Sequence, residues 1–133
     1  MLLRCISSSI IAAGILLLTG CGPGKLDVSK NMVFDNKVEA MSIDLEAQSK
    51  PQTVYIDFTS NGGEVSVYVF KEEDAKGEDG LTLARESKAL GKKTLSKADK
   101  FSVEIPENTP TRVIVRSGGR NAEVKIRVTN QKT

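Results

Sequence analysis

Few side chains in this sequence are able to do chemistry. The 133 residues include no histidine, which is the commonest general base and the commonest metal ligand in proteins. A serine nucleophile would then need a lysine or an amino-terminal base. The two adjacent pairs Ser29-Lys30 and Ser96-Lys97 lie in polar stretches that are typical of solvated surface. We therefore expect no catalytic residues and no enzymatic activity.

Acidic residues cluster at Glu72-Glu73-Asp74 and at Glu78-Asp79. Calcium takes about six to eight oxygen ligands. The spacing here does not match an EF-hand loop, and Lys71 and Lys76 lie among the carboxylates. The pattern favours a solvated loop whose charge keeps a neighbouring sheet edge from pairing with other chains. We expect neither a metal site nor a cofactor.

Basic residues gather in the C-terminal half of the chain. Residues 21–83 contain 6 basic and 12 acidic side chains, whereas residues 84–133 contain 12 basic and 5 acidic ones. If the last two apolar segments pair as a hairpin, alternate positions would form a basic strip that could bind an anionic partner. Alternatively, these charges keep an outer face soluble and complement the acidic strands beside them. The candidate strip consists of Arg112, Arg116, Arg120, Lys125 and Arg127.

The N-terminal region predicts export. Residues 6–18 are apolar or small and follow a single basic residue, Arg4. This run is shorter than the roughly 20 apolar residues that span a bilayer, and it matches the centre of a secretory signal peptide. Directly after it, Leu18-Thr19-Gly20-Cys21 resembles the lipobox of bacterial lipoproteins. That resemblance implies cleavage before Cys21 and a diacylglyceryl thioether on Cys21, with the membrane as the first partner.

These features predict three segments: a signal peptide over residues 1–20, a flexible tether over residues 21–30 and one folded domain over residues 31–133. Cys5 would leave with the signal peptide, so the mature chain would have neither a free thiol nor a disulfide. Gly22 stands where an aspartate retains many lipoproteins in the inner membrane, which favours the outer membrane or the cell surface. Nucleic acid is not an expected partner of an exported chain with few aromatic residues.

Apolar residues in the mature chain recur with a period of two, which predicts strands with one buried and one solvated face. Asn61-Gly62-Gly63 predicts a hairpin between two of these strands, and residues 117–121 predict a second hairpin between the last two. The six alternating segments are residues 41–45, 54–58, 65–69, 101–105, 113–115 and 124–128.

Residues 71–100 form a long connection between two predicted strands, and a structureless stretch of that length is unusual in a compact domain. Leu81 to Glu86 alternates as a seventh strand would, although good helix formers over residues 81–90 leave a helix open. The sequence thus predicts an all-β antiparallel sandwich of about seven strands.

Aromatic residues are scarce, with no tryptophan, two tyrosines and four phenylalanines. Phe58, Phe70 and Phe101 fall in predicted strands and are expected in the core. Tyr55 and Tyr68 lie out of phase with the core residues of their strands. They could face solvent together as a platform for sugars, or cover a second hydrophobic layer.

The order of the motifs over residues 38–129 resembles the bacterial pre-peptidase C-terminal domain. The relevant stretches are residues 52–60, residues 63–70, Leu83-Ala84, Ile105 to Asn108 and Arg112 to Ser117. The resemblance implies a jelly-roll-like sandwich without catalytic activity. Ser66 stands where these domains usually carry an aspartate, and the aromatic residue common before the last strand is missing. The calcium or ligand role of some relatives is therefore not expected here.

The expected function is a lipid-anchored, non-enzymatic envelope protein that acts in structure or in protein interaction. The alternative is a ligand-binding lipoprotein that recognises an anionic glycan or solute through the basic strip.

Overall fold

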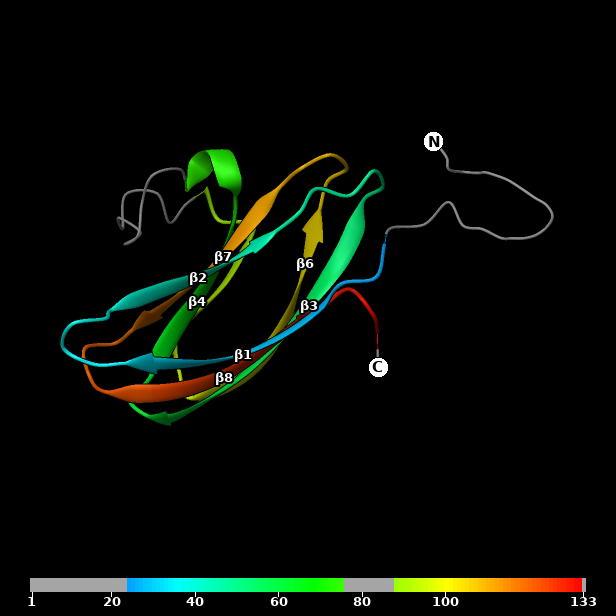
Figure 1. The fold of residues 1–133 in the computed structure, drawn as a ribbon. Coiled ribbons are helices and arrows are strands. Elements are labelled where there is room, and N and C mark those ends of the chain that lie inside the picture. The colour runs from blue at the N-terminus through cyan, green and yellow to red at the C-terminus, as the bar shows by residue number, and fades with distance from the viewer. Residues whose placement is uncertain (1–23, 76–87, 133) are drawn as a thin grey trace, which may run out of the picture.

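The computed structural model describes residues 24–75 and 88–132. Within these ranges the chain forms eight strands in two four-stranded antiparallel sheets that pack as a sandwich (Figure 1). The predicted all-β sandwich is confirmed. The strands are β1 (Asp27–Phe34), β2 (Ala40–Leu45), β3 (Gln52–Gly62), β4 (Val65–Lys71), β5 (Gly91–Ser96), β6 (Ala98–Ile105), β7 (Thr111–Ser117) and β8 (Ala122–Thr129), and the 3-10 helix η1 (Glu72–Asp74) follows β4.

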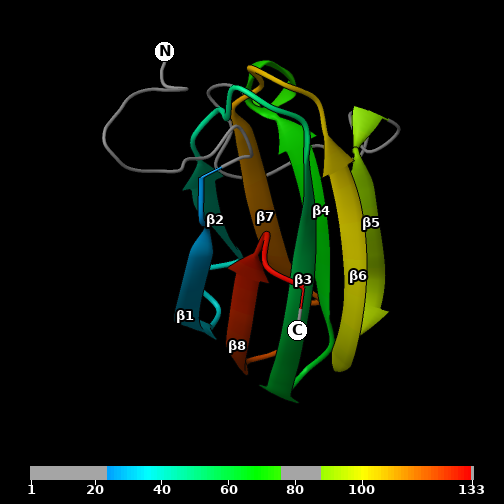
Figure 2. The same ribbon diagram turned by 90° about the vertical axis from the view of Figure 1, so that its right-hand side faces the viewer.

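The strand order is that of a jelly roll. Sheet 1 has the order β1-β8-β3-β6, and sheet 2 has the order β2-β7-β4-β5. Figure 2 shows sheet 1 from its outer side, with β2, β7 and β4 behind it. The chain changes sheet at every step between consecutive strands except β4–β5, which both lie in sheet 2. This double-sheet arrangement of eight strands defines the jelly-roll architecture.

The period-two pattern accounts for the core. All six predicted strand segments lie within observed strands, and their in-phase residues, apart from the exposed Met41, belong to or pack against one cluster between the sheets. The largest fully buried side chains of this cluster include Phe34, Phe58, Met32 and Ile56. Phe101, predicted to be core, packs against the cluster while remaining half-buried. The described residues therefore form one hydrophobic core between the two sheets.

Two strands were not predicted, and one of them corrects a boundary. β1 begins at Asp27, so residues 27–30 belong to sheet 1 and not to the tether predicted over residues 21–30. Lys30 pairs with Ile126 on β8, and the buried Met32 and Phe34 anchor the strand. β5 has mostly polar residues, so its alternation is too weak to show in the sequence. The predicted strand or helix over residues 81–90 lies mainly outside the described residues.

Both predicted hairpins are wrong. β3 and β4 lie in different sheets, and so do β7 and β8. The glycine-rich segments are corners at which two paired strands cross together from one sheet to the other. Two backbone hydrogen bonds join the corners, from Gly63 N–H to the carbonyl of Asn121 at 3.0 Å and from Gly118 N–H to the carbonyl of Glu64 at 2.9 Å. Glycines serve here because the two backbones approach closely.

Sheet 2 carries a second apolar layer on its outer face. Tyr68, Phe70 and Ile114 point away from the main core, yet each is at most 4% exposed. Ala75, next to η1, and the half-buried Ala89 pack against them. The rings of Tyr68 and Phe70 are tilted, with centroids 6.0 Å apart. Of the two alternatives for Tyr68, the second hydrophobic layer is therefore correct. Phe70 is buried as expected, but in this layer.

Candidate functional site

The structure divides the five predicted basic residues between two faces. Because β7 and β8 belong to different sheets, the strip that a hairpin would have formed does not exist. Arg112 and Arg116 lie on the outer face of sheet 2, whereas Lys125 and Arg127 lie on the outer face of sheet 1. Arg120 lies in the corner between β7 and β8 and is exposed. The five residues therefore do not form the single binding surface that the sequence predicted.

Arg112 has a structural role, because its guanidinium group bonds to other parts of the domain. Its Nε donates to Oδ1 of Asp44 at 2.7 Å, and its Nη1 donates to the carbonyl of Ala75 at 3.0 Å. The side chain is only 19% exposed. Arg112 thus joins β7 to β2 and to the turn that covers the second apolar layer. A ligand would have to break these contacts to reach its guanidinium group.

The outer face of sheet 1, by contrast, is polar and hollowed. One hollow of about 500 Å³ lies over β1, β8 and β3, and another of about 350 Å³ lies over β3, β6 and the end of β8. The two hollows share Asp57 and Arg127 and are therefore neighbours on this face. We call the two together the polar trough. Its central residues are Asp57, Thr59, Lys125 and Arg127, and Ser29 and Asn31 on β1 and Lys100 on β6 lie beside them.

The sheet register aligns these side chains. Arg127 pairs with Asp57, and Asp57 pairs with Lys100, so the three lie in one row across β8, β3 and β6. Lys125 and Thr59 form the next row. Residues directly opposite on antiparallel strands project to the same face, about 5 Å apart. The sequence pointed to Lys125 and Arg127 but not to Asp57, Thr59 and Lys100. It shows which residues of each strand are polar, but it does not show which strands are neighbours.

Tyr55 also lines this trough and is half-buried. It lies on sheet 1, whereas Tyr68 is part of the second apolar layer of sheet 2. The two tyrosines therefore do not form a shared platform.

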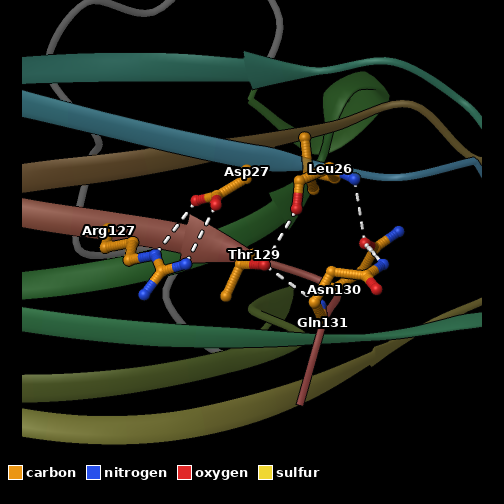
Figure 3. A network of polar contacts seen from close by, with 6 residues as sticks. All are labelled: Leu26, Asp27, Arg127, Thr129, Asn130 and Gln131. Carbon is orange, nitrogen blue, oxygen red and sulfur yellow. Dashed lines mark hydrogen bonds and ion pairs between the residues drawn. The ribbon is translucent and has the colours of Figure 1, made fainter. Parts of the chain in front are cut away.

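Arg127 is held in place by Asp27 on the edge strand β1 (Figure 3). Its Nε donates to Oδ1 of Asp27 at 3.0 Å, and its Nη2 donates to Oδ2 at 2.9 Å. The hydrogen bond from Arg127 holds the pKa of Asp27 below its ordinary value of 3.8. Since the folded-state pKa is lowered, the contribution of the pair to stability is present at neutral pH and is lost only as the pH falls below that ordinary value. Arg127 thus stays fixed and charged at physiological pH.

The same end of the sandwich contains a polar clamp made by Asn130 (Figure 3). Its Oδ1 accepts the N–H of Leu26 at 2.9 Å, and its Nδ2 donates to the carbonyl of Gly24 at 2.7 Å and to Oε1 of Gln52 at 2.9 Å. The backbone N–H of Asn130 also donates to the carbonyl of Leu26 at 3.1 Å. Asn130 therefore fixes the point at which the chain enters the domain.

Neither metal chemistry nor a membrane-spanning helix is found in the part of the chain that the structure describes. Residues 24–75 and 88–132 hold no group of three or more acidic or cysteine side chains that could bind a metal ion. In the same ranges, no helix is long and apolar enough to cross a bilayer.

Comparison with solved structures finds a similarity to the crystal structure of Aeromonas hydrophila PliG, a periplasmic lysozyme inhibitor of g-type lysozyme. The sequence identity is 12% and the TM-score is 0.48, and the alignment covers 86% of this chain and 93% of that chain. Such a distant likeness identifies no binding residue here. Neither a protein-family model nor a curated protein matches the chain. The resemblances to lipoproteins and to the pre-peptidase C-terminal domain therefore stay predictions.

Proposed function

We propose that this protein is a lipid-anchored, non-enzymatic binding module of the bacterial cell envelope, and that the outer face of sheet 1 contacts its partner. The contrast between the two outer faces carries this proposal. The apolar residues Tyr68, Phe70 and Ile114 of sheet 2 are covered within the chain. Sheet 1 instead exposes a hollowed face with ordered charged groups and no covering layer among the described residues. A concave face with a few fixed polar groups is the usual form of a binding site.

The anchor in this proposal is Cys21, which ends the segment Leu18-Thr19-Gly20-Cys21. Gly24 is already attached to the domain, because its N–H donates to Oε1 of Gln48 at 2.9 Å and its carbonyl accepts from Asn130. Only Gly22 and Pro23 separate it from Cys21. From Cys21 to Gly24 the chain can reach at most about 10 Å. The end of the sandwich that holds Asn130 would therefore face the membrane, which we propose to be the outer one.

Replacing Cys21 by serine tests the anchor. We expect Cys21→Ser to remove palmitate labelling and membrane association, because serine cannot form the thioether that carries the lipid. Stable membrane binding needs two or more acyl chains, and the serine variant would lack the thioether-linked pair. We therefore expect no fraction of the variant to stay on the membrane. The measurement is radiolabelled-palmitate incorporation with fractionation of the two membranes. Recovery of a processed, membrane-bound Cys21→Ser protein would overturn the lipoprotein assignment.

Blocking the polar trough tests the binding face. Thr59 is exposed at the centre of this trough, so Thr59→Trp should fill the hollow without touching the core. Asn36→Trp, in the exposed turn between β1 and β2, is the matched control. We expect wild type and Asn36→Trp to retain the same partner from solubilised envelopes, and Thr59→Trp to lose it. Retention of that partner by Thr59→Trp would place the binding face elsewhere.

A further inference from the structure

The two hollows of the polar trough hold more basic than acidic residues, although the mature chain is nearly neutral. Lys100, Lys125, Arg127 and Lys132 line them beside the carboxylate of Asp57. Arg127 is in addition paired with Asp27. A cleft lined mainly by one sign of charge concentrates ligands of the opposite sign.

Two lysines of this trough, Lys100 and Lys125, are available to a ligand. Several cations elsewhere are paired, as Lys88 is with Asp74, Lys93 with Asp99 and Arg112 with Asp44. Lys100 and Lys125 form no ion pair with any residue that the structure describes. Two of the five N–H groups of Arg127 bind Asp27, which leaves three for another acceptor. The trough therefore offers free donors that are suited to carboxylate or sulfate groups.

Neutral polar groups and Asp57 restrict the class of anion. Ser29, Asn31, Thr59 and Ser102 lie beside the cations and can bind hydroxyl groups. The ionised carboxylate of Asp57 can only accept hydrogen bonds. It would bind a hydroxyl donor and repel a densely charged polyanion that has none. This combination fits a ligand that carries hydroxyls between its charges.

The shape of this trough fits a chain of several units. A third hollow of about 280 Å³ continues it past Thr59 and Lys125 to Asn61 and Glu123. From Tyr55 to Asn61, β3 extends about 20 Å at the usual rise per residue. The half-buried ring of Tyr55 at one end provides an apolar surface for a sugar ring.

We propose that the polar trough binds an anionic glycan, with Lys100, Lys125 and Arg127 on its acidic groups and with Asp57 and Thr59 on its hydroxyls. This inference rests on the proposed function, since it names the ligand class of the same face.

The test compares four polymers on the full-length mature lipoprotein in detergent: polygalacturonate, dextran sulfate, neutral dextran and inorganic polyphosphate. We expect the first or second to bind, and neutral dextran and polyphosphate to bind at least tenfold more weakly. Lys100→Ala/Lys125→Ala should weaken glycan binding about tenfold or more, since each change removes a charged hydrogen bond. Lys37→Ala/Lys50→Ala makes the same change in net charge away from the trough and should alter the affinity less than twofold. Unchanged thermal unfolding of both variants checks their folding.

Each other outcome overturns part of the proposal. Equal binding of polyphosphate would show that the protein binds charge and not a glycan. Equal binding of neutral dextran would remove the anionic requirement. An equal loss of glycan affinity in the two double-lysine variants would show that the site lies outside the trough. If neither anionic glycan bound, the proposed ligand class would be wrong. If that happened while Thr59→Trp still lost its envelope partner, the proposed function would stand without this inference.

Discussion

Gly62→Ala is expected to lower the free energy of unfolding by about 2–5 kcal/mol, through backbone strain and overpacking together. Gly62 has φ +115°, a conformation that residues with a side chain rarely adopt. A Cβ atom at this position would lie 2.6 Å from the carbonyl oxygen of Asn121 and 3.2 Å from Cα of Ala122. Both neighbours are backbone atoms of the second corner, so neither can move without disturbing the paired crossing of the strands.

Gly119→Ala is the matched control for Gly62→Ala. Gly119 has a similar φ of +101°, but no atom lies within 4 Å of its would-be Cβ. Its substitution should cost only the backbone strain, about 1–2 kcal/mol. Urea denaturation followed by far-ultraviolet circular dichroism measures both variants. Equal losses would show that the close approach of the two corners contributes nothing to stability.

Asn130→Ala is expected to lower the free energy of unfolding by about 2–4 kcal/mol, because it removes several hydrogen bonds and leaves a buried acceptor unpaired. The side chain of Asn130 bonds to Gly24, Leu26 and Gln52 at 2.7–2.9 Å. The side chain of Gln52 is buried, so its Oε1 would lose its partner away from solvent. The segment from Gly24 to Leu26, where the chain enters the sandwich, would detach first.

Amide hydrogen exchange at Leu26, together with urea denaturation, checks this prediction. We expect faster exchange at Leu26 in Asn130→Ala, because its N–H loses the Oδ1 acceptor. Gln131→Ala removes one exposed side-chain hydrogen bond, from Nε2 to Oδ1 of Asn130, and should cost less than about 1 kcal/mol. Unchanged exchange at Leu26 in Asn130→Ala would show that the clamp does not hold the chain entry.

Local patterns predicted strands well where one face of the strand meets the core. Val54, Ile56 and Phe58 alternate with polar residues because they pack between the sheets while their neighbours face solvent. β4 is buried at six consecutive positions, from Val65 to Phe70, so its alternation indicated one buried face where the structure has two. β5 shows the opposite failure, since its residues are half-buried or exposed and leave little apolar signal.

Turn chemistry could not distinguish a hairpin from a corner. Asn61-Gly62-Gly63 supplies the conformational freedom that either connection needs. In this chain the partner of each corner is the other corner, which is more than fifty residues away in the sequence. No local signal reports a contact at that separation.

The sequence by itself determined that the chain is rich in strands, that it lacks histidine and that its C-terminal half is basic. These properties depend on residue type and on period, which each segment expresses alone. Only the tertiary structure decided which charges lie together. Long-range antiparallel pairing aligned Arg127, Asp57 and Lys100 in one row and moved Arg112 and Arg116 to the opposite face. The physical reason is that strand neighbours are chosen by packing the whole core, so a surface made across strands has no signature in any one of them.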